Sequence, residues 1–368
     1  MTRKLPAFFF TMFFVLASGF AVSAASVEGT WALVKGDKPD EVHVTFNRSS
    51  SRHNTWHIGR DFKTAEFSGL DLSKSGRQDV RFTLKRDAGD ITGEGVVLNG
   101  SGSGVFSYTP NNSYFAELKR IGFDGVEEKQ QWSFALTDVS LAFARGMAER
   151  NVPGLDADRL LGFRSVGGDL AFVDDLRAAD IRIDSADTLI AFRVHDVTAA
   201  FVMNIRRAGF SPTNDQLVAM AVHEVTPEYI AEMKAAGFTG DISNLVAYRV
   251  HDVTPAFAKE IRDMGFSVSA DKLVALRVHD ITPDYIRAMR KEFGDDLTLE
   301  NIIAATVHDV TPQFVAEIRA LGLDPSFEQL IAMAVHDVTP EYIQKLRSKG
   351  ITTTDVDKLV ALAVHGIH

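Results

Sequence analysis

The chain of 368 residues contains no cysteine. Without thiols there is no disulfide framework, no thiolate zinc site and no lipid anchor on an N-terminal cysteine. The chain also lacks an excess of positive charge, because 39 basic residues stand against 49 acidic ones. A net negative protein is a poor partner for nucleic acid and for anionic membrane surfaces. We therefore expect neither of them as a partner.

An apolar run lies at the start of the chain. Arg3 and Lys4 precede the run AFFFTMFFVLASGFAV, and small residues follow it near Ala24. This order is typical of a secretory signal peptide, with an uncleaved membrane anchor as the alternative. We predict that residues 1–25 are removed and that the mature protein is periplasmic or secreted, with no transmembrane segment. Its 37 basic and 49 acidic residues give a formal charge of −12.

Residues 26–110 alternate between apolar and polar positions in short runs such as EVHVTFN and DVRFTLKR, separated by Gly, Asp, Asn and Ser. Period-two alternation with β-branched and aromatic residues predicts an antiparallel β domain. Five glycines between Gly93 and Gly104 are a weak match to a phosphate-binding loop, but such a loop must open a helix. Here a further strand follows, so Asn99-Gly100 is interpreted as a hairpin turn.

From residue 111 to 368 one unit recurs. Sequences of the type VHDVTPEY return every 28 or 29 residues, and two degenerate units place Thr137 and Val166 where later units have histidine. Such a period is the signature of stacked helical repeats. The fold class is therefore α+β: a small N-terminal antiparallel β domain and an α-solenoid of about nine helical hairpins.

Each unit carries its own start and stop signals. Thr226 is a natural N-cap, Pro227 suits the first helical position, and Gly237 suits the left-handed position after the first helix. Capping boxes such as Thr213 to Gln216 open the second helix, which ends at the histidine. The predicted N-caps that precede proline are Thr226, Thr254, Thr282, Thr311 and Thr339.

The histidines form a ladder with three open interpretations. They are His195, His223, His251, His279, His308, His336 and His365. A shared metal ion is disfavoured because equivalent atoms of stacked units lie about one helix diameter apart. A structural role at the end of the second helix, next to free carbonyls and the helix dipole, is favoured. A pH-responsive role is the third, because six of the seven precede Asp or Glu.

Positions that vary between units are candidates for recognition, since solenoids bind partners through variable positions of one face. Two places before the histidine, the candidate recognition residues are Arg193, Arg249 and Arg277. The regular Tyr or Phe three places after each threonine is interpreted as core. We expect no catalytic residue, cofactor or metal, because each motif of the repeats recurs in step and the chain shows no unique constellation of such groups.

The segment FTLKRDAGDITGEGVVLNGSGSGVFSYTPNNSYFAELKRIGF, together with LVALRVHDITPDYIRAMR, resembles a group of bacterial exported proteins with VHGVTPEY-type repeats. Similar segments are found in extracytoplasmic parts of some BlaR1-like membrane metallopeptidases. The resemblance covers about residues 82–368. It implies an exported sensing or binding module, and not a peptidase, because His-Glu-x-x-His is absent.

These patterns predict a non-enzymatic exported repeat scaffold that binds a protein or peptide of the cell envelope. Its oligomeric state is left open by the sequence. One alternative is a hydrolase with its site in the β domain, where His43, His53, His57 and Asp61 form the unrepeated cluster. Alternation along strands brings His43 and His57 to one face. The other alternative is a pH-responsive envelope sensor that uses the histidine ladder.

Overall fold

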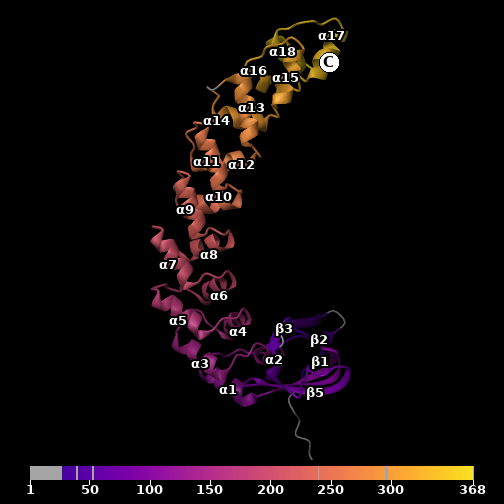
Figure 1. Cartoon of the computed structure of the whole chain (residues 1–368), viewed down its shortest axis with the longest axis vertical. Coiled ribbons are helices and arrows are strands. Elements are labelled where there is room, and N and C mark those ends of the chain that lie inside the picture. The colour runs from indigo at the N-terminus through magenta and orange to yellow at the C-terminus, as the bar shows by residue number, and fades with distance from the viewer. Residues whose placement is uncertain (1–26, 39, 52–53, 239, 295–296, 368) are drawn as a thin grey trace, which may run out of the picture. The chain divides into compact units, whose positions relative to one another are not determined.

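The computed structural model describes residues 27–38, 40–51, 54–238, 240–294 and 297–367 (Figure 1). The predicted signal peptide, residues 1–25, and His53 lie outside the described residues. A sheet of seven strands comes first and eighteen α-helices follow it in tandem. The predicted fold class is therefore confirmed: an antiparallel β region followed by a helical repeat region.

The sheet is antiparallel throughout, in the order β3-β2-β1-β7-β6-β5-β4. Its strands follow the predicted alternating runs. They are β1 (Val27–Lys35), β2 (Glu41–Ser51), β3 (Asn54–Lys63), β4 (Phe67–Ser68), β5 (Arg77–Arg86), β6 (Gly89–Leu98) and β7 (Ser101–Pro110), with a 3-10 turn at Thr64–Glu66. Asn99 and Gly100 both have positive φ, 49° and 85°, and join β6 to β7 as the predicted hairpin turn.

The sheet curls around an aromatic core. Trp31 in β1 contacts Phe82 in β5 with ring centroids 5.2 Å apart, although two strands separate β1 from β5 in the sheet. Phe46 contacts Phe106 at 5.1 Å on the same inner face. Helix α2 (Glu128–Leu136) packs on β6 and β7, where Trp132 stacks on Phe106. The inner face of the sheet is thus closed by side chains of the first helices.

The helices come in pairs, and we call the odd-numbered member of each pair the A helix and the even-numbered member the B helix. The first four are α1 (Asn112–Arg120), α2, α3 (Leu141–Glu149) and α4 (Ala157–Ser165). The later A helices are α5 (Leu170–Ala178), α7 (Ala199–Arg207), α9 (Pro227–Ala235), α11 (Pro255–Asp263), α13 (Pro283–Phe293), α15 (Pro312–Ala320) and α17 (Pro340–Ser348). The later B helices are α6 (Ala186–Val194), α8 (Asn214–Val222), α10 (Ile242–Val250), α12 (Ala270–Val278), α14 (Leu299–Val307), α16 (Phe327–Val335) and α18 (Val356–Val364).

The caps lie where the sequence places them. The backbone N–H of Tyr229 donates to the Thr226 hydroxyl at 3.2 Å, Pro227 is the first helical residue, and the four other threonines before proline cap their helices in the same way. The capping box of Thr213 with Gln216 is also present. Ser269 caps α12 in the same way, with the backbone N–H of Lys272 donating to its hydroxyl.

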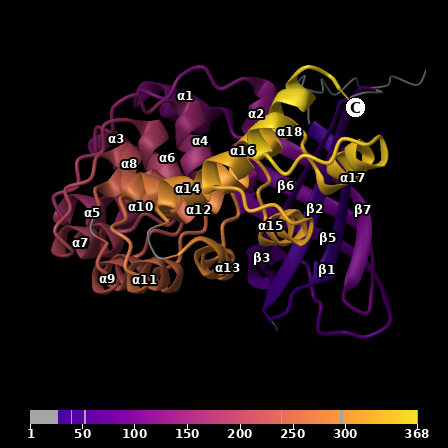
Figure 2. The ribbon, with the colours of Figure 1, turned by 90° about the horizontal axis from the view of Figure 1, so that it is seen from above.

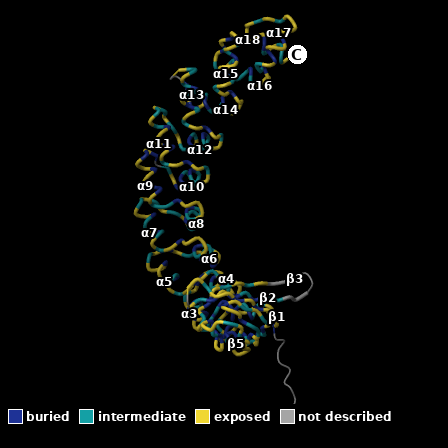
Figure 3. Tube along the Cα trace, turned by 45° about the vertical axis from the view of Figure 1, so that its right-hand side comes forward, coloured by how far each residue is buried: buried dark blue, intermediate teal, exposed yellow. Residues whose placement is uncertain are grey.

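The chain divides into two compact units after Leu170. The first contains the sheet with α1 to α4, so the change from strands to helices at Pro110 does not coincide with this division. In the second unit the A helices form one row and the B helices another (Figure 2). One hydrophobic cluster extends from Ile205 in α7 to Leu359 in α18. Buried and exposed positions alternate along these helices, as expected for short helices that are stabilised by their neighbours (Figure 3).

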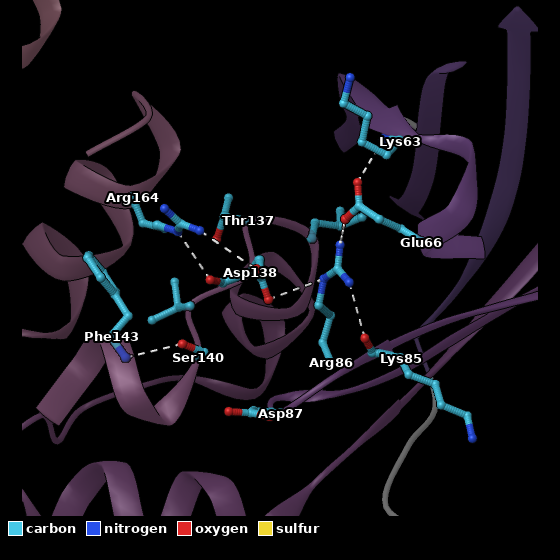
Figure 4. A network of polar contacts seen from close by, with 12 residues as sticks. Lys63, Glu66, Lys85, Arg86, Asp87, Thr137, Asp138, Ser140, Phe143 and Arg164 are labelled. Carbon is cyan, nitrogen blue, oxygen red and sulfur yellow. Dashed lines mark hydrogen bonds and ion pairs between the residues drawn. The ribbon is translucent and has the colours of Figure 1, made fainter. Parts of the chain in front are cut away.

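A charged network joins the sheet to the first helical pairs inside the first unit (Figure 4). The Arg86 side chain is only 11% exposed and forms an ion pair with Glu66. Its Nε lies 3.4 Å from the Asp138 carboxylate, which makes a second ion pair but not a hydrogen bond. Arg164 of α4 donates to the carbonyl of Asp138 at 3.2 Å. The Arg60 guanidinium donates to the carbonyl of Leu136 at 3.0 Å, and burial lowers its pKa. The sheet therefore holds the first turn between α2 and α3.

In the described part of the chain, no single helix is both long and apolar enough to cross a bilayer; α6 and α7 reach that limit only as a pair bent by 86°.

Candidate functional site in the turns after the B helices

The turn after each B helix is closed by its own backbone. After α10 the N–H of Val253 donates to the carbonyl of Tyr248 at 2.7 Å, and the N–H of Asp252 donates to the carbonyl of Arg249 at 3.2 Å. These two bonds form a Schellman motif with Asp252 at the left-handed position, φ 54°. The bond that corresponds to Val253–Tyr248 recurs after every B helix, so all nine turns follow one design.

The histidine precedes the left-handed residue and is the last residue of the helical turn, as predicted. His251 has φ −107° and ψ 20°, and the other six histidines occupy the same C-cap position. We expected the imidazole to satisfy free carbonyls, but backbone N–H groups do this instead. Five of the imidazoles are exposed and two, His251 and His279, are half-buried. Within the described residues none of the seven imidazoles forms a hydrogen bond.

An exposed valine precedes every histidine. The seven side chains are between 46% and 55% exposed, and they are Val194, Val222, Val250, Val278, Val307, Val335 and Val364. In α10 the buried positions are Ile242, Leu245 and Tyr248, so Val250 lies off the buried stripe. Together with the histidines and the acidic residues Asp196, Glu224, Asp252, Asp280, Asp309 and Asp337, these valines form what we call the Val-His-acid ladder.

The acidic residues of the ladder all have left-handed backbone conformations, with φ between 52° and 56°. Glycine occupies the equivalent positions 167 and 366, where φ is 78° and 67°. Left-handed backbone is costly for residues with a side chain, although Asp tolerates it better than most. All six carboxylates are exposed. Asp196 and Glu224 pair with Arg193 and Arg249, whereas the other four form no ion pair with any described residue.

The candidate recognition arginines lie against aromatic rings of the A helices. The Arg249 guanidinium stacks 5.0 Å from the Tyr229 ring, and its Nε donates to the carbonyl of His223 at 3.0 Å. Arg277 stacks on Phe257 at 5.4 Å, and Arg193 stacks on Phe172 at 5.8 Å. All three are half-buried. Their contacts bind each B helix to the A helix of its own unit, which is a structural use of these side chains.

The regular aromatic position belongs to the core edge, as predicted. Tyr229, Phe257 and Tyr342 are buried, and the other three, Phe201, Tyr285 and Phe314, are half-buried against the same cluster. Where the residue is tyrosine, its hydroxyl donates to the carbonyl at the end of the turn that follows the B helix. Tyr229 reaches Val253 at 2.8 Å, and burial raises the pKa of Tyr229 to about 12.

The two unrepeated histidines that the structure describes in the β domain, His43 and His57, do not lie together. His43 lies opposite Asp61 in the register of β2 and β3, and its Nδ1 is 2.7 Å from the Asp61 carboxylate. His57 lies opposite Asn47, four residues along β3 from Asp61, which is roughly 13 Å at the usual rise of a strand. His43 and His57 therefore share a face of the sheet without meeting in one site.

The His43–Asp61 pair is open to solvent, with side-chain exposures of 49% and 74%. A hollow of about 720 Å³ lies elsewhere on the sheet, lined by residues that include Asn47, Thr92, Glu94 and Val105. His43 and Asp61 are not among its lining residues. A pair that can hold a proton is thus present, but the hollow that would hold a substrate lies apart from it. Across the ranges that the structure describes, no three His, Asp or Glu side chains are placed to hold a metal ion.

Two features of the ladder escaped the sequence reasoning. The exposed valine had a signal, because an apolar residue recurs in every unit at a position outside the helical stripe of Leu245 and Tyr248. The left-handed acid also had one, since His365 is followed by glycine where six other histidines are followed by Asp or Glu. Exchange with glycine indicates positive φ.

Comparison of the chain with models of known protein families, with curated proteins and with solved structures found no match.

Proposed function

We propose that the protein is a non-enzymatic, exported scaffold whose helical repeats bind a protein or peptide partner in the cell envelope. The observation that supports this most strongly is the Val-His-acid ladder: seven units present the same exposed valine, followed by a histidine that is exposed in five of them. Repeated exposed apolar side chains mark interaction surfaces, and arrays of stacked units suit extended partners. The export part of the proposal rests on residues 1–25.

A crosslinking experiment tests this function. The mature chain, carrying an affinity tag, is crosslinked in envelope fractions and recovered under denaturing conditions, and the attached proteins are identified. The proposal expects one or a few proteins crosslinked through residues of the B-helix turns. Recovery of small metabolites alone, or of an indiscriminate set of proteins equal to that captured by an unrelated acidic protein, contradicts it.

The His43–Asp61 hydrogen bond favours a second candidate, a hydrolase in the β domain, because a carboxylate that holds an imidazole is half of a general-base arrangement. Its exposure and its distance from the hollow count against this candidate. Assays of the full mature chain on cell-wall, peptide and ester substrates test it. Activity that is lost in His43→Ala and in Asp61→Asn, and retained in His57→Ala, replaces the scaffold proposal with the hydrolase.

A pH-responsive sensor is the remaining candidate, and the exposure of the imidazoles beside carboxylates supports it. Histidine is the side chain whose charge ordinarily changes between pH 5 and 8. Partner capture at pH 5.5 and at pH 7.5, compared for the natural chain and for a chain with all seven histidines changed to Gln, separates the two. A pH response that persists without the histidines excludes them as the sensor.

A further inference from the structure

The Val-His-acid ladder presents an apolar group in each of its seven rungs and an acidic group in six of them. The valines are β-branched, half-exposed and at the last position of a helix, where neither helix propensity nor burial favours them. The turn itself is closed by backbone bonds and by the buried residue after the acid, as at Val253, so the exposed valine is not needed to close it.

The acids add a second constraint. Gly366 shows that glycine fits the left-handed position, yet six consecutive turns place Asp or Glu there. Four of these carboxylates, at Asp252, Asp280, Asp309 and Asp337, form no ion pair among the described residues and project from neighbouring units. The nearby basic side chains, Arg249 and Arg277, lie back against aromatic rings. The ladder therefore presents uncompensated negative charge at neutral pH.

The spacing of the rungs limits what binds along them. Packed helices lie about 8–10 Å apart, and the B helices of neighbouring units contact one another. Three residues of polyproline II complete one turn and span about 9.3 Å, so every third side chain of such a segment lies on one face at about the spacing of the rungs. A β-strand has a similar reach, but its every third side chain points to the opposite face. A polyproline II segment that runs along the ladder thus presents every third side chain to successive rungs. In an α-helix, which rises about 1.5 Å per residue, side chains of adjacent turns on one face lie only about 5.4 Å apart. This is shorter than the spacing of the rungs.

Lysine and arginine match both groups of a rung. Their aliphatic stems cover apolar surface while the charged head reaches a carboxylate. A lysine stem on Val278 with its ammonium group at Asp280 uses both side chains at once. An acidic or uncharged segment could cover the valine side chains, but it would leave the carboxylates without a cationic partner.

We propose that the Val-His-acid ladder binds a polypeptide segment in the polyproline II conformation that carries Lys or Arg at every third residue. This inference rests on the proposed function and specifies the chemistry of its partner. Seven rungs span about 54 Å, which corresponds to a polyproline II segment of about 17 residues. The complementarity of charge and the match of period together define this occupant.

A labelled peptide of six Lys-Ser-Thr repeats tests the register directly by fluorescence anisotropy with the mature chain. Two control peptides have the same length: one groups all six lysines at one end, and one carries Glu in place of Lys. The spaced peptide is expected to bind about tenfold tighter than the grouped one, and the Glu peptide is expected not to bind. Equal affinity for the spaced and grouped peptides overturns the proposal, because charge alone then accounts for binding.

Variants separate the two groups of the rung. The triple change V250S/V278S/V307S and the triple change D252N/D280N/D309N should each weaken the spaced peptide about tenfold or more. The matched controls are V34S/V105S, two valines of similar exposure in the β domain, and E228Q/E232Q/E341Q, three exposed carboxylates of the A helices. Both controls should leave binding unchanged, and thermal melts confirm that every variant is folded. Loss of affinity in the controls equal to that in the ladder variants refutes the ladder as the site.

Two further results distinguish this inference from the function beneath it. If the ladder variants still capture the natural chain's envelope partner, the scaffold function stands and the ladder proposal fails. If the spaced peptide binds through the ladder while no envelope protein is captured, the ladder stands and the scaffold function fails. Concentration-dependent self-association that V250S/V278S/V307S abolishes, measured by light scattering, replaces the peptide with a second copy of this chain as the occupant.

Discussion

The phenolic hydroxyl of Tyr229 donates a 2.8 Å hydrogen bond to the carbonyl of Val253, so an A helix is fastened to the turn that leads into the next A helix. The same bond links Tyr114 to Val139, Tyr285 to Val310 and Tyr342 to Ile367. In the units with Phe201, Phe257 or Phe314 the ring is kept and the hydroxyl is missing. Packing of the ring and bonding of the turn are therefore separable.

Tyr229→Phe should lower the free energy of unfolding by about 1–2 kcal/mol, because a buried carbonyl loses its partner while the ring remains. Tyr248→Phe is the matched control: Tyr248 is buried in α10, and its hydroxyl has no hydrogen-bond partner among the described residues. Urea unfolding of both variants measures the difference. Equal losses for the two variants would show that the hydroxyl–carbonyl bond contributes nothing.

Arg86→Ala should destabilise the first compact unit by about 1.5–3 kcal/mol, because Glu66 and Asp138, which are themselves partly exposed, lose the largely buried cation that lies between them. Arg81→Ala on the same strand is the control. Arg81 is 76% exposed and pairs with Glu94, so its loss should cost about 0–1 kcal/mol. Calorimetry that resolves the transition of the sheet checks both, and a melt of the sheet unmoved by Arg86→Ala would count against the network.

Hydrogen bonds from Arg120 and then from Arg145 lower the pKa of Glu117 to about 2. The unfolded chain holds this proton near the ordinary value of 4.5, so the ionised form stabilises the fold above that pH. This contribution should disappear as the pH falls from 4.5 to 2. Glu117→Gln should therefore be less stable than the natural chain at pH 7 and match it near pH 2. A difference that stays constant between pH 7 and pH 3 would rule out this linkage.

The sequence predicted the helical pairs because each start and stop is a local event. Thr254 with Pro255 fixes the start of α11, and Gly265 with φ 87° marks its end, so no knowledge of the neighbours is needed. The hairpin at Asn99 and Gly100 was predictable for the same reason.

The candidate site was predicted less well, because its chemistry depends on contacts between units. Arg249 looks exposed from sequence, yet its guanidinium lies between the ring of Tyr229 and the preceding turn at His223. His251 looks like a partner for helix carbonyls, yet the backbone of Asp252 and Val253 takes that place. Composition gives no sign that a turn is closed by its own N–H groups. The repeated valine outside the buried stripe and the glycine that replaces the acid after His365 were the readable indications of the ladder.

His251→Gln should change the free energy of unfolding by no more than about 0.5 kcal/mol, because the imidazole is bonded to no described residue and the turn is closed by backbone. The measurement is a urea titration at pH 7, with Thr254→Ala beside it. Loss of the Thr254 cap should cost about 0.5–2 kcal/mol, so it provides the positive control. A loss in His251→Gln as large as that in Thr254→Ala would restore a structural role for the imidazole.

Asp280→Gly tests whether the ladder keeps its acids for function at a cost in stability. Asp280 has φ 53°, and this left-handed conformation destabilises the folded state by about 1–2 kcal/mol for a residue with a side chain. Glycine avoids this strain, but its greater freedom stabilises the unfolded chain by about 0.4–1 kcal/mol. The substitution should therefore raise the free energy of unfolding by about 0.5–1 kcal/mol.

If the ladder binds a cationic segment, the same variant should bind the spaced lysine peptide more weakly, because one carboxylate is gone. Asp280→Asn provides the comparison, since it removes the charge and keeps a side chain that tolerates positive φ. If both variants bind more weakly and only Asp280→Gly is more stable, the carboxylate accounts for binding and the left-handed backbone accounts for the loss of stability. A stabilised Asp280→Gly that binds the peptide as tightly as the natural chain would leave the acids without a role in binding.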